Sequence, residues 1–268
     1  MTFDLYGAFY AAFVVVGLAA GRFIAPRCGV PRGRFTIAAV LILLFTFVGS
    51  RLYPLLRLST DPSLTQIAAA LLSLSASTES TGAYLGLFLG SIIAFPFTGI
   101  PIGRGLDLIT PFIGLAVVLG RLGCFSAGCC YGTATSSFVG VVYGEQTQAY
   151  RHQVRTGRIL PDAPHTLPIH PTQLYEATCG LLLTILVIVL YKRHALSGRL
   201  FFLYGALYFP TRFVLEFYRG DSRGTIWSLS YPQWLAICAT LVSIVVLISA
   251  QRLSPDTVTA PQAGRAAR

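Results

Sequence analysis

The sequence predicts an all-α polytopic membrane protein with about seven transmembrane helices and a small extracytoplasmic cap. Hydrophobic residues make up 54% of the 268 positions and charged residues only 11%, whereas a soluble domain has about 25% charged residues. The mean hydropathy is +0.67. Residues 35–50, 82–100 and 226–250 contain no charge, and a spanning helix needs about 20 apolar residues. These observations exclude a soluble globular enzyme and a disordered chain.

The apolar segments predict the individual spans. The first segment is followed, not preceded, by its basic residues, so we expect a membrane helix and not a cleavable signal peptide. Residues 62–78 are charge-free and moderately apolar, and we interpret them as interfacial or re-entrant. We expect a single membrane domain over 1–251 and a disordered cytoplasmic tail over 252–268. The predicted spans are 5–25, 35–56, 82–100, 106–124, 170–191, 199–218 and 229–250.

The formal net charge of +10 predicts the orientation of the chain. In a soluble protein such a surplus would suggest nucleic acid, but here it fits the excess of cations in cytoplasmic loops, and we expect no nucleic acid partner. Basic residues gather in loops 26–34 and 192–198, and most acids lie in the alternate segments. We therefore expect the N-terminus outside, the cap at about 125–168 outside, and the C-terminus in the cytoplasm.

Ionisable side chains lie near the predicted outer ends of four spans. Each costs about 3 kcal/mol at the centre of a spanning helix, so each needs a partner or a function. They are Arg51, Arg121, His170, Glu176, Arg212, Glu216 and Arg219.

Two interpretations fit these charges. Arg212, Glu216 and Arg219 share one helix face, so Arg212 and Glu216 could form a purely structural ion pair. Alternatively, the four arginines outnumber the two glutamates, which predicts an anion that completes the set. Guanidinium groups bind phosphate in a bidentate manner, so a phospholipid headgroup is the candidate.

Three cysteines cluster at Cys124, Cys129 and Cys130. Their spacing matches no common zinc pattern, and we predict no metal. The expected outer location favours a disulfide between Cys124 and either Cys129 or Cys130. Thiols that only pack, or that serve a metal or catalysis, are the alternatives.

Several segments together resemble the prolipoprotein diacylglyceryl transferase family. Residues 120–132 resemble its pattern Gly-Arg-x-Gly-Asn-Phe-x-Asn-Gly-Glu-x-x-Gly, and residues 170–176 resemble His-Pro-(Ser/Thr)-Gln-Leu-Tyr-Glu. Residues 212–219 resemble Arg-Phe-x-x-Glu-x-x-Arg. Asp107 with Pro111, Tyr6-Gly7 and Gly49-Ser-Arg51 also fit. The matches follow the family's order from residue 6 to about 219.

The chain departs from the family at four polar positions. Cys124 and Ala127 stand where the family has asparagines, and Cys129 stands where it has a glutamate. Thr81 replaces a histidine that is a candidate general base. The arginines are kept, so the resemblance implies the fold more strongly than identical chemistry.

The resemblance implies transfer of a diacylglyceryl group from phosphatidylglycerol, or a similar anionic phospholipid, to the lipobox cysteine of a lipoprotein precursor. Arg121 and Arg212 would stabilise the leaving phosphate. His170 would act on the acceptor thiol, unless it only hydrogen-bonds backbone at a helix start. We expect no cofactor, a monomer, and location in the bacterial plasma (inner) membrane. The implied substrate-binding residues are Tyr6, Arg51, Gln173, Tyr175, Glu176, Glu216 and Arg219.

Other functions stay open from the sequence. One is a paralogous transferase with another lipid donor or acceptor. Another is a non-catalytic lipid-binding or thiol-redox membrane protein in which the three cysteines carry the function. A transporter is disfavoured because internal repeats are absent from the sequence.

Overall fold

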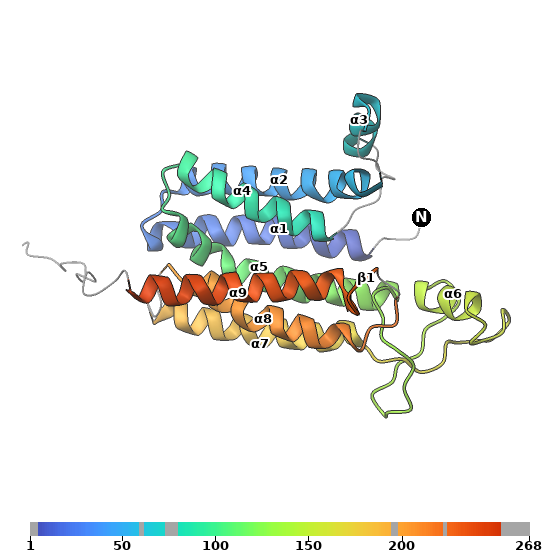
Figure 1. Cartoon of the computed structure of the whole chain (residues 1–268). Helices are drawn as coiled ribbons and strands as arrows, with labels where there is room; N and C mark the ends of the chain where they lie inside the picture. Colours follow the sequence, from blue (N-terminus) through green and yellow to red (C-terminus); the bar gives the residue numbers. More distant parts are fainter. Residues whose placement is uncertain (1–4, 59–61, 73–79, 194–197, 222–223, 253–268) are drawn as a thin grey trace, which may run out of the picture. The chain divides into compact units, whose positions relative to one another are not determined.

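The computed structural model describes residues 5–58, 62–72, 80–193, 198–221 and 224–252, which are mostly helical (Figure 1). A two-stranded antiparallel hairpin accompanies the helices. The elements are α1 (Leu5–Ile24), η1 (Ala25–Cys28), α2 (Arg32–Leu58), α3 (Leu64–Leu72), α4 (Ser80–Phe97), α5 (Ile102–Ala127), α6 (Gln148–Arg155), α7 (Thr172–Lys192), α8 (Leu200–Glu216), β1 (Thr225–Ile226), β2 (Leu229–Ser230) and α9 (Tyr231–Arg252).

Within the described part of the chain, four helices are long and apolar enough to cross a membrane: Arg32–Leu56, Ile102–Ala127, Thr172–Lys192 and Tyr231–Ser249. The apolar helix Thr81–Phe97 is shorter. The prediction of a mostly helical chain with candidate membrane-spanning helices is therefore confirmed. A helix also occupies each of the seven predicted ranges, but the count of seven spans stays a prediction. In the ambiguous segment 62–78, the structure forms α3, which has no buried residue; residues 73–79 lie outside the described residues.

The chain divides into two compact units, Met1–Gly120 with Ile188–Gly198, and Arg121–Val187 with Arg199–Arg268. In the first unit, α2 packs along α4 through glycines. A Cβ added at Gly49 or Gly82 would collide with the backbone of the other glycine, and one at Gly86 would collide with the Phe45 carbonyl. These small residues let the two helix backbones approach closely, as in membrane helix pairs.

Asp107, one of the residues that carry the family resemblance, has a structural contact in the first unit. It is buried on α5, and its carboxylate accepts a hydrogen bond from the backbone N–H of Gly198. Gly198 has a left-handed φ of 81°, which glycine adopts without a steric cost. Asp107 therefore fixes the turn that precedes α8.

In the second unit, α8 and α9 pack against each other (Figure 1). A Cβ at Gly205 would lie 2.6 Å from the Ser243 hydroxyl oxygen on α9, so glycine is needed at this close approach. The exposed side of α9 remains apolar, as at Leu241 and Val245. Such a surface is typical of a helix in contact with lipid.

The polar insertion between α5 and α7, residues 128–171, is an ordered structure of its own. Ala134 and Val141 each form an isolated β-bridge with Ile169. Tyr131, Tyr143, Ala149 and Ile169 form a small buried core. The Thr147 side chain caps the start of α6 by accepting a hydrogen bond from the N–H of Tyr150. The predicted extracytoplasmic location of this insertion stays a prediction.

Candidate active site

The second unit contains a network of buried charges carried by α5, α7 and α8. Arg121 Nη2 of α5 lies 2.9 Å from Glu176 Oε1 of α7. Arg212 Nε of α8 approaches the same oxygen at 3.8 Å, and the Tyr208 hydroxyl donates to it across 2.6 Å. One carboxylate oxygen of Glu176 is therefore the point at which three helices meet.

The network continues from α8 into the segment after it. Arg212 Nη1 lies 2.6 Å from Glu216 Oε2, an ion pair by distance whose atoms are not aligned as a hydrogen bond. Ser230 donates to the other Glu216 oxygen. Arg219 lies 3.7 Å from Glu216 and donates two hydrogen bonds of 2.8 Å to Asp221. This bidentate pair has the strongest geometry available to a guanidinium group.

The second-unit network is balanced in charge, which corrects one expectation from the sequence. Asp221 adds a third carboxylate, so three arginines face three acids among these residues. The predicted surplus of guanidinium groups is therefore absent from this network. The remaining arginine of the predicted set, Arg51, lies on α2 in the first unit, with its guanidinium carbon 5.3 Å from the centre of the Phe47 ring.

The exposed fraction of the side chain distinguishes Arg219 from Arg121 and Arg212. The Arg219 side chain is only 3% exposed, while those of Arg121 and Arg212 are 14% and 11% exposed. The bidentate contact with Asp221 engages Arg219, whereas part of Arg121 and Arg212 remains accessible. A guanidinium group has five N–H donors, so both can hold Glu176 and still donate to an incoming anion.

The segment 170–176 is organised around the start of α7. His170 Nδ1 lies 3.1 Å from the Tyr175 hydroxyl, and the His170 ring also packs edge-on against Tyr218. The His170 backbone carbonyl accepts hydrogen bonds from Gly132 and Thr172. The His170 ring thus contacts Tyr175 and Tyr218, and no contact of the ring with the arginines is among those described. The role of His170 in catalysis stays a prediction.

Gln173 and Thr172 fix the chain that follows α5. Gln173, which is 1% exposed, donates through Nε2 to the Cys129 carbonyl across 2.7 Å. Thr172 donates to the Cys130 carbonyl across 3.0 Å. Gln173 also contacts the Tyr143 hydroxyl, and burial raises the pKa of Tyr143 to about 12. Gln173, expected to bind substrate, thus has its amide nitrogen directed at the protein backbone.

A tight turn at the end of α5 brings the cysteines together. Gly128 has a left-handed φ of 60°, and the N–H groups of Gly128 and Cys129 bond the carbonyls of Phe125 and Cys124. This pair of bonds is the Schellman motif, which reverses the chain after a helix. Cys129 therefore lies beside Cys124, although five positions separate them. A Cβ at Gly128 would lie 2.5 Å from the Thr147 Cβ.

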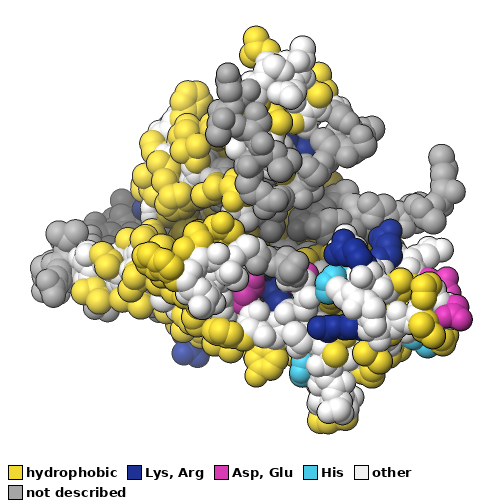
Figure 2. Space-filling model, turned by 45° about the vertical axis from the view of Figure 1, so that its right-hand side comes forward, with side chains coloured by type: hydrophobic (Ala, Val, Ile, Leu, Met, Phe, Trp, Pro, Cys, Tyr) yellow, Lys and Arg dark blue, Asp and Glu magenta, His cyan; other side chains and the backbone are white. Residues whose placement is uncertain are grey.

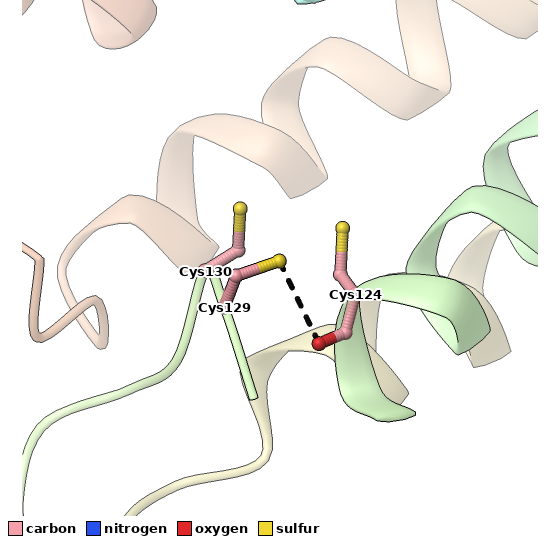
Figure 3. Close-up of side chains that lie close together, drawn as sticks. All are labelled: Cys124, Cys129 and Cys130. Carbon is pink, nitrogen blue, oxygen red and sulfur yellow. Dashed lines mark hydrogen bonds between the residues drawn. The ribbon is translucent and has the colours of Figure 1, made fainter. Parts of the chain in front are cut away.

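All three clustered cysteines are free thiols (Figure 3). Their sulfur atoms lie within 4.8 Å of one another, and Cys129 Sγ also points to the Cys124 carbonyl at 3.7 Å. Cys130 adopts a left-handed φ of 57°, which is uncommon for residues other than glycine, asparagine and aspartate. A disulfide from Cys124 to Cys129 or Cys130 stays a prediction.

Two other residues singled out from the sequence belong to the first unit. Tyr6 lies on α1 in the first unit, and its side chain is outside the described residues. Thr81 lies at the start of α4, next to Gly82 in the packed helix pair. Arg121, Arg212, Glu176, Glu216 and Arg219 are the predicted residues that the second unit brings into one network.

Sequence reasoning missed Tyr208, Asp221 and Ser230. Tyr208 precedes Arg212 by four residues, as Arg212 precedes Glu216, so the helix period places all three on one face of α8. Asp221 follows Arg219 by two residues in a segment without helical periodicity. Ser230 reaches Glu216 only because the hairpin returns the chain to the end of α8.

A polar pocket of about 500 Å³ adjoins Asp221. Two arginines and a histidine of α6 line it, so it is predominantly basic. Figure 2 shows Lys, Arg and His side chains gathered in one region of the visible surface, in contrast to the largely hydrophobic helices. The lining residues are Tyr131, Gln148, Arg151, His152, Arg155 and Asp221.

Comparison with known proteins gives consistent matches. A family model described as prolipoprotein diacylglyceryl transferase matches residues 1–249. A relative from Clostridium tetani, named phosphatidylglycerol–prolipoprotein diacylglyceryl transferase, is 36% identical over 141 residues, 53% of this chain and 51% of the relative. The chain thus spans about half the length of that relative.

Two further relatives with the same name match over more of the chain. The protein from Paenarthrobacter aurescens is 28% identical over 268 aligned positions, which cover 90% of this chain and 77% of the relative. The protein from Mycolicibacterium paratuberculosis is 29% identical over 265 positions, covering 92% and 60% respectively.

Proposed function

The chain belongs to the prolipoprotein diacylglyceryl transferase family, and we propose that it transfers the diacylglyceryl group of phosphatidylglycerol to the lipobox cysteine of a prolipoprotein. The observation that carries this proposal is the pair Arg121 and Arg212. Their guanidinium groups approach one carboxylate oxygen from two helices and remain partly exposed. Two such groups can bind the two oxygens of a phosphodiester.

The reaction is a substitution at a carbon atom of the glyceryl group. The acceptor thiol loses its proton to solvent, its sulfur forms a bond to that carbon, the carbon–oxygen bond to phosphate breaks, and glycerol 1-phosphate leaves with the electron pair. Negative charge therefore grows on the phosphate in the transition state. Arg121 and Arg212 act there as fixed positive charges, and such stabilisation of developing charge is a large part of many rate enhancements.

The carboxylates position these arginines. Glu176 contacts both of them, and Glu216 contacts Arg212. Arg219 is held by Asp221 and Glu216, so its role is to position Glu216 and the chain after α8. We assign Glu176, Glu216 and Arg219 to positioning the headgroup site rather than to direct contact with the leaving group.

The remaining assignments concern substrate entry. His170 and Tyr175 form one hydrogen-bonded pair, which we place at the acceptor side. Tyr6 and Arg51 are assigned to the lipid donor on the strength of the family motifs that contain them. The protein is a monomer of the inner membrane, with its N-terminus and polar insertion outside and its C-terminus in the cytoplasm.

Complementation tests the proposed function directly. The chain is expressed in a bacterium depleted of its own transferase, and a reporter lipoprotein is examined by mass spectrometry for the diacylglyceryl group. We expect modification with the wild-type chain and with R158Q, which changes an exposed arginine outside the network. With R121Q, the reporter lipoprotein should carry no diacylglyceryl group. An unmodified reporter with normally accumulated wild-type protein would reject the function.

A further inference from the structure

Three thiols converge in the second unit, at the turn after α5. The sulfur atoms of Cys124, Cys129 and Cys130 lie within 4.8 Å of one another (Figure 3). Within the described residues, this group of metal-ligating side chains has three members. A disulfide would use two of them and leave the third, whereas a single metal ion would engage all three.

The backbone around the thiols is held in place from two sides. The Schellman turn bonds the Cys129 N–H to the Cys124 carbonyl across 3.1 Å. Two side chains of α7 then hold the next two carbonyl groups by hydrogen bonds. Gln173 donates to the carbonyl of Cys129, and Thr172 donates to the carbonyl of Cys130. Metal sites are precise when their ligands are supported in this way by surrounding hydrogen bonds.

The conformation of Cys130 also indicates a site. Its left-handed φ of 57° costs a non-glycine residue about 1–2 kcal/mol. Strained backbone of this kind occurs preferentially where a side chain must be presented to a ligand. Here the strain directs a third sulfur to the same place as the other two.

Charge around the thiols favours a divalent ion. Arg121 and Arg219 are close enough to Cys130 to interact with it electrostatically, and Arg121 also interacts with Cys124. Three thiolates with Zn²⁺ carry one net negative charge, whereas three thiolates with Cu⁺ carry two. The nearby guanidinium groups already face carboxylates, so they can compensate one net negative charge more easily than two. The zinc complex is therefore favoured over the Cu⁺ complex.

We propose that Cys124, Cys129 and Cys130 bind one zinc ion as thiolates and leave its fourth coordination position to the acceptor thiol. Zn–S bonds of about 2.3 Å in a tetrahedron require sulfur atoms about 3.8 Å apart. The three sulfur atoms already lie within 4.8 Å of one another, which is close to that value. Three protein ligands with one open position are the arrangement of catalytic zinc sites, and Cys129 and Cys130 are partly exposed.

The fourth ligand rests on the proposed function, whereas zinc binding itself does not. A thiol that coordinates zinc loses its proton, which passes to solvent. Its sulfur then forms the bond to the glyceryl carbon, the carbon–oxygen bond breaks, and glycerol 1-phosphate leaves with the electron pair. No oxidant or reductant is needed. Zinc would thus activate the thiol in a chain that has Thr81 and Cys129 where the family has histidine and glutamate.

Metal analysis of the full-length protein tests the binding step. Protein purified in detergent without chelators should contain about one zinc ion per chain. C124S, C129S and C130S should each lose most of it. C179S and C238S, at cysteines outside the cluster, are the matched controls and should keep it. Wild-type protein without zinc, or with Cu⁺ in its place, would overturn the proposal. So would a disulfide within the cluster found by alkylation and mass spectrometry.

Cobalt substitution tests the open position. Co²⁺ bound to the three thiolates should give a tetrahedral spectrum with a thiolate charge-transfer band. A synthetic prolipoprotein signal peptide with its lipobox cysteine should alter that spectrum, and the same peptide with serine should not. A spectrum unchanged by the cysteine peptide would overturn the assignment of the fourth ligand.

Transfer assays separate this inference from the proposed function. Removal of zinc should lower diacylglyceryl transfer by about 100-fold, the scale on which proton removal contributes to catalysis, and zinc should restore it. Equal activity with and without zinc would reject the catalytic metal while leaving the transferase function intact. Zinc binding and a peptide-sensitive cobalt spectrum without any transfer would reject the transferase function instead.

Discussion

Arg121 Nη2 lies 2.9 Å from Glu176 Oε1, and this contact joins α5 to α7 within a buried part of the second unit. Arg212 approaches the same oxygen from α8. The same carboxylate oxygen therefore positions both arginines. A substitution of either one should alter the position at which the other can bind an anion.

The arginine pair gives the first prediction. R121K and R212K keep the charge but lose the fork of N–H donors that fits a phosphate. Each variant should accumulate normally and lose about 10²–10³-fold in transfer rate, as when one donor to a developing anion is removed. Transfer to a reporter lipoprotein in isolated membranes is the measurement.

The control for this prediction combines R212Q with E216Q. A purely structural ion pair predicts that the double variant recovers what either single change loses. We expect the double variant to remain inactive, because the Arg212 charge is needed at the phosphate. Recovered activity would remove Arg212 from the site and leave Arg121 as the remaining arginine with a catalytic role.

The second prediction concerns the bidentate pair after α8. D221N removes the charge that faces Arg219, whose side chain is 3% exposed. Loss of a hydrogen bond to a charged group costs about 1.5–3 kcal/mol, so the midpoint of thermal unfolding in detergent should fall. R158Q, at an exposed arginine, should leave the midpoint unchanged. An equal midpoint for D221N and wild type would contradict the structural role of this pair.

The third prediction uses two left-handed glycines. Gly128 and Gly157 have φ of 60° and 69°. A Cβ at Gly128 would lie 2.5 Å from Thr147, whereas nothing lies within 4 Å of one at Gly157. G157A should lose about 1–2 kcal/mol from backbone strain alone. G128A should lose more, because Thr147 and α6 must also move. Equal unfolding midpoints for the two variants would contradict the close approach.

The fourth prediction is the orientation of the chain. Reporter fusions at Arg268 and within residues 145–160 should report opposite sides of the membrane, with Arg268 in the cytoplasm. The distribution of basic residues between alternate loops is the physical reason. Signals from the same side would overturn the count of seven spans.

The positions of the helices, and contacts between neighbours on one helix face, could be predicted from the sequence. The long apolar runs determine where helices form, and a helix was found at each of the seven predicted ranges. The spacing of Arg212 and Glu216 likewise predicted their ion pair, because neighbours on a helix face are fixed by local geometry, and this pair is present. Arg219 also contacts Glu216, but α8 ends at Glu216, so Arg219 does not share the helix face that the sequence predicted for it.

Contacts between distant segments were not predictable in the same way. Nothing in the local sequence specifies that Glu176 contacts Arg121, or that Ser230 returns to Glu216 through a hairpin. Asp221 lies in an irregular segment beyond the predicted span 199–218, so it was not counted with the charged residues of the spans and the charge balance was misjudged. The spacing of the cysteines also does not reveal the left-handed turn at Gly128, which brings Cys129 beside Cys124.

The balance of charge in the second-unit network has a consequence for biogenesis. Arg121 and Glu176 lie on different candidate spans, so each helix enters the bilayer carrying a charge without its final partner. Insertion of an arginine costs about 2.5–3.5 kcal/mol at the helix centre and less towards the ends, and Arg121 lies near the C-terminal end of α5. Once α5 and α7 meet, that cost is offset by the ion pair. We therefore expect the neutralisation of these two charges to favour association of α5 and α7 within the membrane.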